Sequence, residues 1–359
     1  MAKFAFIIHP LDVSDVARKY KFARYMSPGM VESILRFVKP SMVSEITGVE
    51  SLTGATTSGW FVGCPMTPRQ LMSGGKIAVE KVIRAGKIAQ DLGADIVGLG
   101  AYTSIVGDGG REVADALDIA VTTGNSYTCY TAVEGALKAA EMMGIVPKKA
   151  TAAVLGATGS IGRACALILA DKVAHIALVG RRLDRLEEVG DEVRGRGATV
   201  ASHTGMTAAM RDADIVITVT SALEAVVEPE QIKSGAVVCD VARPRDVSVA
   251  VAQKRDDVLV IEGGVVAVPG PVNFHFNFGF PPRTSYACMA ETMMLALEGR
   301  IEDYSIGRDL DAEKVAETGR WAAKHGFKLA GFRAFEHAVS EEEIARRRER
   351  AEAIKAGRG

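Results

Sequence analysis

Short apolar runs alternate with amphipathic stretches along most of the 359-residue chain. In the first part, apolar runs of strand length occupy residues 4–8, 42–46, 60–62 and 96–99. Apolar residues recur with helical spacing in residues 76–92 and 127–143. Strands and helices that follow one another in this way form a sheet with helices packed on it. We therefore expect an N-terminal α/β domain over residues 1–147.

The alternation becomes more regular after residue 150. Buried strands are expected at residues 152–155, 176–179, 215–219, 237–240 and 258–261, with helices at 161–170 and 183–193. This spacing predicts a Rossmann-type, doubly wound parallel sheet in a second domain, residues 148–270. Helical patterns at 286–298 and 311–325 then precede a charged tail. Residues 271–359 are therefore expected to form a mostly helical C-terminal segment.

A glycine-rich loop follows the first strand of the second domain and leads into its first helix. Glycines at 156, 159 and 162 allow a tight turn and a close approach of the backbone to a pyrophosphate. The helix start supplies free N–H groups and the positive end of a dipole. This context favours a dinucleotide site over a tight turn without a ligand. The residues expected to bind are Gly156, Thr158, Gly159, Ser160, Ile161 and Gly162.

The ends of the later strands refine the cofactor prediction. NAD-binding proteins usually carry an acidic residue at the end of the second strand, where this chain has Arg181 and Arg182. A guanidinium fits a 2′-phosphate, so the sequence favours NADPH over NADH; two solvated arginines at a helix start are the alternative. Ligands of such sheets lie beyond the carboxyl ends of the strands, where ordinary turns are the alternative. The further cofactor residues expected there are Thr220, Ser221, Asp240, Gly263 and Gly264.

Cys288 is the candidate nucleophile. Two prolines at 281 and 282 precede Thr284 and Ser285, one of which is expected to cap a helix that has Cys288 in its first turn. The dipole of that helix favours a thiolate, which attacks a thioester or an aldehyde. The alternative is a small buried hydrophobic residue, which is the usual role of a free cysteine. The cysteines at 64, 129, 165 and 239 are weaker candidates because they fall in strands, helices or a turn.

Composition narrows the class of protein. The chain has 43 Lys and Arg against 44 Asp and Glu, so its net charge does not suggest a nucleic-acid partner. Five cysteines without a C-x-x-C pair argue against a disulfide framework, and no metal site is expected. The first apolar run is too short for a signal peptide, and the longest uncharged stretch, 263–282, is rich in glycine and proline. We therefore expect a cytoplasmic protein without a transmembrane segment.

Several motifs occur in the order found in one enzyme family. They are Gly-Ala-Tyr-Thr-Ser-Ile at 100–105, Thr-Thr-Gly-Asn-Ser-Tyr-Thr at 122–128, Gly-Ala-Thr-Gly-Ser-Ile-Gly at 156–162, Glu-Gly-Gly-Val-Val at 262–266 and Ala-Cys-Met-Ala-Glu at 287–291. Ser-Ile-Gly-Arg at 305–308 and His-Gly-Phe at 325–327 follow. In this combination the chain resembles the cyanobacterial long-chain acyl-acyl-carrier-protein reductases over most of its length. It departs from them in detail, since Glu262 stands where Asn is usual.

The resemblance implies a function for each part of the chain. The family reduces a long-chain fatty acyl thioester to the fatty aldehyde with NADPH, and the thioester is carried by acyl-carrier protein or coenzyme A. The cysteine of its A-C-x-A-E motif takes the acyl group, a role that carries over to Cys288. Its glycine loop and strand-end arginine correspond to Gly156, Gly159, Gly162 and Arg181. The N-terminal domain would then hold the acyl substrate, and an aldehyde-consuming enzyme is an implied partner.

Other residues are candidates for the substrate site, each with a structural alternative. Thr103, Ser104, Thr123 and Asn125 are hydrogen-bond donors for the thioester, or only turn and cap residues. Phenylalanines at 274, 276, 278 and 280 alternate with polar residues and glycine, which suits a wall of an acyl channel, although a buried core edge is preferred. A basic cluster at residues 18, 19, 21 and 24 would attract an acidic carrier, although a solvated helix face is preferred.

Two other functions remain open. A shikimate-dehydrogenase-like protein also joins an α/β domain to a nicotinamide domain, and it transfers hydride to a small hydroxy or keto acid without a covalent thiol. Lys76 or Lys81, with an aspartate, would then form the acid–base pair. A non-catalytic NADPH-binding sensor is the third possibility. Activity of a Cys288→Ala variant would favour the dehydrogenase, and the absence of any turnover would favour the sensor.

Overall fold

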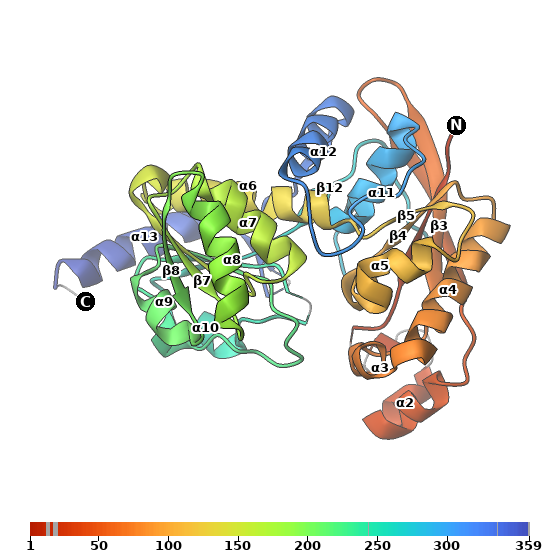
Figure 1. Cartoon of the computed structure of the whole chain (residues 1–359), viewed down its shortest axis with the longest axis horizontal. Coiled ribbons are helices and arrows are strands. Elements are labelled where there is room, and N and C mark those ends of the chain that lie inside the picture. The colour runs from red at the N-terminus through yellow and green to blue at the C-terminus, as the bar shows by residue number, and fades with distance from the viewer. Residues whose placement is uncertain (12–14, 17–20, 243, 336, 358–359) are drawn as a thin grey trace. The chain divides into compact units, whose positions relative to one another are not determined.

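Two separate sheets divide the chain into two units (Figure 1). The computed structural model describes all residues except 12–14, 17–20, 243, 336 and 358–359. Unit 1 comprises Met1–Asn125, Val266–Arg308 and Arg320–Lys328, and unit 2 comprises Ser126–Val265, Asp309–Gly319 and Leu329–Gly359. The division differs from the three consecutive segments that we expected, because the C-terminal residues are shared between the two units. The α/β fold class is confirmed.

Unit 1 contains a five-stranded sheet in the order β2-β3-β1-β4-β5. Its strands are β1 (Phe4–Ile8), β2 (Ser41–Glu50), β3 (Thr56–Gly63), β4 (Ile96–Leu99) and β5 (Ala120–Thr122). β2 runs antiparallel to β3, and the other neighbours are parallel. The structure confirms β1 and β4 with the predicted bounds. The sequence pattern does not predict β5, which has only three residues.

The helices of unit 1 cover both faces of this sheet. They are α2 (Pro28–Leu35), α3 (Pro68–Ser73), α4 (Gly75–Asp91), α5 (Val106–Ala114) and α11 (Ala287–Glu298), with 3-10 turns η1 (Lys21–Tyr25) and η2 (Ala101–Ser104). Successive side chains of a strand point to opposite faces. Ile7 and Leu99 therefore pack in one cluster with Val82 of α4. Phe6 and Gly98 face the other side, where α11 lies.

Gly98 lets α11 lie directly against the sheet. A Cβ at this position would stand 2.2 Å from Thr292 Oγ1 of α11 and 2.5 Å from the ring of Phe6. Real Cβ atoms do not approach other atoms so closely, so any larger residue would displace the helix or the ring. The position of α11 on β4 thus depends on a missing side chain in the sheet.

Unit 2 is built on a six-stranded sheet in the order β11-β10-β9-β6-β7-β8, in which all neighbouring strands are parallel. The strands are β6 (Thr151–Leu155), β7 (His175–Val179), β8 (Thr199–His203), β9 (Ile215–Thr218), β10 (Val237–Asp240) and β11 (Leu259–Glu262). Counted from β6, this is the order 3-2-1-4-5-6 reversed, which defines the Rossmann fold. The predicted doubly wound sheet is confirmed, with β8 as an additional, partly exposed edge strand.

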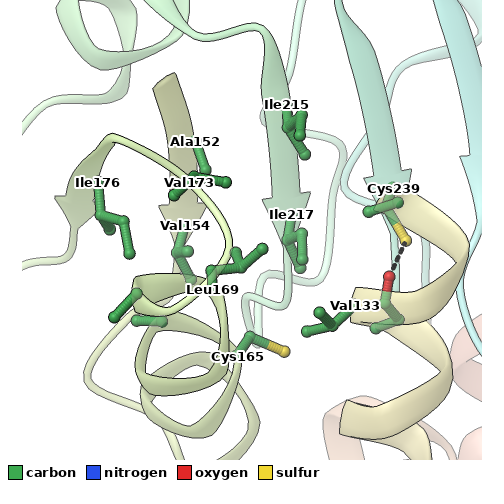
Figure 2. Close-up of a cluster of buried hydrophobic side chains, with 14 of the residues drawn as sticks. Val133, Ala152, Val154, Cys165, Leu169, Val173, Ile176, Ile215, Ile217 and Cys239 are labelled. Carbon is green, nitrogen blue, oxygen red and sulfur yellow. Dashed lines mark hydrogen bonds between the residues drawn. The ribbon is translucent and has the colours of Figure 1, made fainter. Parts of the chain in front are cut away.

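The helices of unit 2 are α6 (Asn125–Met142), which starts at the boundary, α7 (Ser160–Ala170), α8 (Leu183–Arg194), α9 (Met206–Asp212), α10 (Val249–Lys254) and α13 (Glu341–Lys355). Figure 2 shows one core of this unit, in which Leu169 of α7 lies against Val154 and Ile217 of the sheet. Cys165 and Cys239 belong to the same cluster. Both are therefore packed as small apolar side chains.

The C-terminal part contains helices, as predicted, and also short strands. α12 (Ala312–His325) crosses the boundary between the units, while β12 (Val265–Ala267), β13 (Thr284–Tyr286) and β14 (Lys328–Leu329) form a small sheet. β15 (Phe332–Ala334) and β16 (His337–Val339) pair as an antiparallel hairpin before α13. Among the described residues, no helix combines the length and apolarity needed to cross a bilayer.

Replacing Gly98 tests the contact between α11 and the sheet. Gly98→Ala should lower the free energy of unfolding by about 2 kcal/mol, because the added methyl group overlaps Thr292 and Phe6. Gly29→Ala is the matched control: Gly29 lies within α2 with no atom near its missing Cβ, so the change should stabilise by roughly 0.5–1 kcal/mol. Urea denaturation measures both. Equal stability of Gly98→Ala and the wild type would contradict the packing.

Candidate active site

Cys288 is the second residue of α11, in the first turn as the sequence predicts. The N-cap is Tyr286, so the predicted cap at Thr284 or Ser285 is wrong; those two residues extend as β13 instead. No side chain caps the helix start, which leaves that role to backbone or ligand. Of the five cysteines, Cys288 alone is partly exposed. The sulfur that the sequence favours is therefore the accessible one.

The other thiols are packed into the cores. Burial raises the pKa of Cys64 to about 12. A hydrogen bond shared with its neighbour Cys129, with the two sulfurs 3.5 Å apart, and burial raise the pKa of Cys165 well above its ordinary value. Cys239 donates to the backbone oxygen of Ala132 (Figure 2 shows its sulfur in the core). A nucleophile must be ionised and reachable, and these four cysteines are buried.

Two glycines lie beside Cys288 at the carboxyl edge of the unit 1 sheet, and the first of them, Gly124, lets the cysteine approach the strand end. Gly124 follows β5 with φ +71°, and a Cβ on it would lie 2.3 Å from both Cα and Cβ of Cys288. Gly100 follows β4, and a Cβ there would lie 3.7 Å from Cys288 Sγ. Both glycines belong to the motifs that carry the family resemblance. They bring the ends of two parallel strands to the thiol, and such strand ends are where ligands of open α/β sheets bind.

Glu291 ties the first turn of α11 to these strand ends. Its fully buried carboxylate accepts hydrogen bonds from Thr122 Oγ1 at 2.6 Å and from Ser305 Oγ at 2.8 Å. Thr122 Oγ1 also accepts from the N–H of Gly124, at 3.2 Å, beside Cys288. The sequence assigns no role to Glu291, although it stands in the Ala-Cys-Met-Ala-Glu motif. The sequence does contain one signal for such a role, which is an acidic residue one helical turn after the candidate nucleophile.

The candidate substrate donors surround the same edge, but their hydroxyl groups bond to the backbone. Thr103 Oγ1 donates to the oxygen of Gly100 and accepts from its N–H, which closes the turn η2. Ser104 donates to Ala101 in that turn, and Thr123 donates to the oxygen of Ser305. Asn125 is buried at the start of α6. For Thr103 and Ser104 the contacts match the alternative role as turn residues, whereas Thr123 joins two segments that are distant in sequence.

His9 is a second residue of this edge to which the sequence analysis assigns no role. It follows β1 directly, its Nδ1 lies 3.0 Å from the oxygen of Pro10, and its Nε2 accepts from the N–H of Tyr102 in η2. Burial lowers the pKa of His9 to about 4, so the imidazole is neutral at ordinary pH. A neutral ring with both nitrogens engaged positions η2 and is not a ready proton donor.

Two other histidines, His275 and His325, also make structural contacts. His275 is exposed and bonds to Thr47. His325 is buried between Ser51 and Glu298, with both contacts at 2.7 Å.

The glycine loop of unit 2 meets the geometric needs of a dinucleotide. Gly156 has φ +84°, and a Cβ on it would lie 2.8 Å from the oxygen of Val219, beyond the neighbouring strand β9. A Cβ on Gly162 would lie 2.2 Å from the oxygen of Gly156, so helix and loop touch there. Gly159 N-caps α7 without a side chain. The loop and helix start thus form a backbone cradle that side chains would fill, which fits a pyrophosphate.

The two arginines after β7 differ in their surroundings. Arg182 is exposed and forms a two-pronged ion pair with Asp184, whose pKa this contact lowers to about 2. Arg181 is also exposed and has no hydrogen bond or ion pair within the part of the chain that the structure describes. Arg181 is therefore the cation that remains available for a 2′-phosphate.

The remaining strand-end residues hold loops in place. Thr220 donates to buried Asp246 through its hydroxyl and its N–H. The Asp240 carboxylate accepts from the N–H groups of Ala242 and Val247. Ser221 is exposed, and Gly263 packs where a Cβ would lie 2.7 Å from Val241. Gly264 has φ +79°. These residues shape the carboxyl edge of the sheet, and their contact with a cofactor stays a prediction.

Comparison with known proteins identifies the family. The family model for shikimate / quinate 5-dehydrogenase matches residues 136–262. The aminotransferase PigE of a Serratia species is 29% identical over 340 residues; the match covers 90% of this chain but only 39% of that protein. A long-chain acyl-[acyl-carrier-protein] reductase of Synechococcus elongatus is 32% identical over 330 residues, which cover 88% of this chain and 94% of that enzyme. The chain belongs to the long-chain acyl-[acyl-carrier-protein] reductase family.

Membership makes the chain a nicotinamide-dependent reductase and confirms the family resemblance seen in its motifs. Among solved structures, 5-ketofructose reductase of a Gluconobacter strain aligns with a TM-score of 0.36 and 14% identity, covering 89% of this chain and 98% of that one. A TM-score this low supports no argument about function.

Glu291 can be tested through the stability of the reductase. Glu291→Ala leaves the buried hydroxyls of Thr122 and Ser305 without their acceptor, which should lower the free energy of unfolding by about 3 kcal/mol. Glu291→Gln keeps one acceptor oxygen and should cost less. Glu302→Ala, which removes an exposed partner of Arg300, should cost under about 0.5 kcal/mol. Urea denaturation that shows equal losses for Glu291→Ala and Glu302→Ala would contradict the network.

Proposed function

We propose that this protein reduces a long-chain fatty acyl thioester to the fatty aldehyde with NADPH, through an acyl group carried on Cys288. The observation that supports it most is the position of Cys288. It is the partly exposed cysteine, it lies in the first turn of α11, and it lies against glycines at two strand ends. The Synechococcus relative is named for acyl-[acyl-carrier-protein], so we propose that thioester class as the substrate.

In the first step, the chain supplies the nucleophile and a place for developing charge. The Cys288 thiolate attacks the thioester carbonyl carbon, a new C–S bond forms, and the C–S bond to the carrier breaks. The carrier leaves as a thiolate that takes a proton from solvent. The helix dipole favours the Cys288 thiolate, and the N–H groups at the start of α11, which no side chain caps, would stabilise an oxyanion that develops beside the thiol.

A row of aromatic rings leads toward Cys288 and is our candidate for the acyl site. Phe61 of β3 contacts Phe274, Phe276 and Phe278 at centroid distances of 5.5–6.3 Å. The contacts continue from Phe278 to Phe280 and then to Tyr286, the N-cap of α11. Phe274 is buried, whereas the next three phenylalanines are partly exposed. The predicted alternation is present, and a partly exposed apolar row suits an alkyl chain better than a closed core.

In the second step, the acyl group on Cys288 would be reduced, and Cys288 would be the leaving group. When bound, NADPH supplies the hydride that turns the acyl group into aldehyde, and the sulfur of Cys288 leaves as the thiolate with which it began. In unit 2, the glycine cradle would hold the pyrophosphate and Arg181 the 2′-phosphate.

The structure gives no support to the lysines expected as acid–base residues of a shikimate-dehydrogenase-like enzyme. The ammonium of Lys81 is buried and donates to the backbone oxygens of Leu35, Arg36 and Pro65. Lys76 is exposed. The shikimate / quinate dehydrogenase match is confined to residues 136–262, which form most of the Rossmann-type unit and exclude Cys288. A cofactor-binding sensor would bind NADPH but would never become acylated.

Acylation of Cys288 is a direct expectation. Incubation with a long-chain acyl-carrier protein or acyl-coenzyme A, without NADPH, should add one acyl mass that hydroxylamine removes, because a thioester is cleaved by this reagent. Peptide mass spectrometry should place the acyl group on Cys288. Cys288→Ala should carry no adduct, while the buried-site control Cys64→Ala should be acylated like the wild type. An adduct that persists in folded Cys288→Ala would disprove the assignment.

Cofactor choice gives a second expectation. Arg181→Gln should raise the KM for NADPH about tenfold and leave the KM for NADH unchanged, because only NADPH carries the phosphate that the guanidinium would bind. Arg182→Gln is the matched control and should change the KM for NADPH much less, since this arginine is already paired with Asp184. Steady-state kinetics with both cofactors decides. Equal effects of the two substitutions would rule out a special role of Arg181.

A further inference from the structure

Helix α2 presents large apolar side chains to solvent at one end of unit 1. Residues of this eight-residue helix divide into two faces: Val31 and Leu35 are buried, whereas Met30 and Ile34 are 55% and 43% exposed. Tyr25 before the helix is 92% exposed and Phe37 after it is 87% exposed. An open groove along the same face is lined by Met26, Ser27, Gly29, Met30, Ser33 and Ile34. Soluble proteins rarely leave such a set of apolar side chains uncovered without a reason.

The orientation of this face is fixed by buried polar contacts. Lys81 of α4 inserts its ammonium under the C-terminal end of α2 and donates to the oxygen of Leu35 at 2.6 Å and of Arg36 at 3.2 Å. Gln70 and Thr67, at the start of α3, bond to the oxygen and the carboxylate of Glu32. α2 and α3 lie next to each other in Figure 1. The apolar face therefore cannot turn inward without breaking these bonds.

The charges around the apolar face are almost all positive. Residues 21–39 contain four basic residues and one acidic residue, Glu32, whose carboxylate is engaged by Thr67. The four basic side chains are exposed, and none has an ion pair among the residues that the structure describes: Lys21, Arg24, Arg36 and Lys39. Two members of the basic cluster predicted from the sequence, Arg18 and Lys19, lie outside the described residues.

We propose that this α2 surface, formed by Tyr25, Met30, Ile34, Phe37 and the four basic residues, docks onto an anionic lipid membrane. Apolar side chains that protrude from a short helix enter the boundary between headgroups and acyl chains, and flanking Lys and Arg bind the anionic headgroups. An acidic protein would satisfy the charges but would have to bury the protruding Phe37 and Tyr25 as well. The proposal does not depend on the proposed reaction, since docking needs neither thioester nor cofactor.

Co-sedimentation of the full-length protein with phosphatidylcholine vesicles, with and without phosphatidylglycerol, tests the proposal. The protein should sediment with the anionic vesicles, remain in solution with the neutral ones, and dissociate as salt is raised. The triple variant Met30→Ser, Ile34→Ser and Phe37→Ser should bind at least about tenfold more weakly. A fourfold variant, with Lys21, Arg24, Arg36 and Lys39 each replaced by Gln, should lose the preference for anionic vesicles.

The matched control removes exposed apolar residues elsewhere: Ile77→Ser, Val146→Ser and Val249→Ser, at positions 70%, 56% and 59% exposed. This control should bind vesicles like the wild type, and circular dichroism should show that every variant is folded. Failure of the wild type to bind anionic vesicles, or equal binding by the α2 triple variant, would overturn the proposal. Binding of an acidic acyl-carrier protein that the triple variant loses, without any vesicle binding, would also overturn it in favour of a protein partner.

Discussion

The close contact between the first turn of α11 and the ends of β4 and β5 is the constraint on which the candidate site depends. Gly98 and Gly124 leave space that no other residue would leave, and the helix occupies it, while Gly100 leaves space for the ring of Phe6. Glu291 then holds the same turn through Thr122 and Ser305. The close approach of the backbones and the buried carboxylate thus place Cys288 at the strand ends. There it is partly exposed, whereas the other four cysteines are buried.

The candidate sites of the two units share one structural feature, which is a set of glycines at the ends of parallel strands. In each, neighbouring parallel strands end at one edge of the sheet, and glycines at that edge let the backbone come close to another group. In unit 1 that group is the turn that carries Cys288, and in unit 2 it is the start of α7. The row of phenylalanines ending at Tyr286 adds an apolar surface to unit 1. A thioester reductase needs such a division between acyl binding and cofactor binding.

Hydrophobic periodicity was enough to locate the long elements but not the contacts between distant segments. The Rossmann strands and α7 follow from runs of apolar residues and from the glycine loop, and the structure confirms them. Periodicity carries no information on which segments pair, so it missed the return of residues 266–308 to unit 1 and the three-residue strand β5. It placed the cap of α11 too early, because Thr284 and Ser285 pair as a strand. Glu291 and His9 escaped notice because their roles arise from neighbours far away in sequence.

In the proposed reaction, an acyl group on Cys288 becomes an aldehyde by accepting hydride from NADPH. Incubation of the full-length protein with a long-chain acyl-carrier-protein thioester and NADPH deuterated at the transferred position of the nicotinamide tests it most directly. Gas chromatography with mass spectrometry should then detect the fatty aldehyde carrying one deuterium at its carbonyl carbon, in amounts equal to the NADPH oxidised. A folded, NADPH-binding protein that forms no deuterated aldehyde from any thioester of a chain-length series would contradict the account.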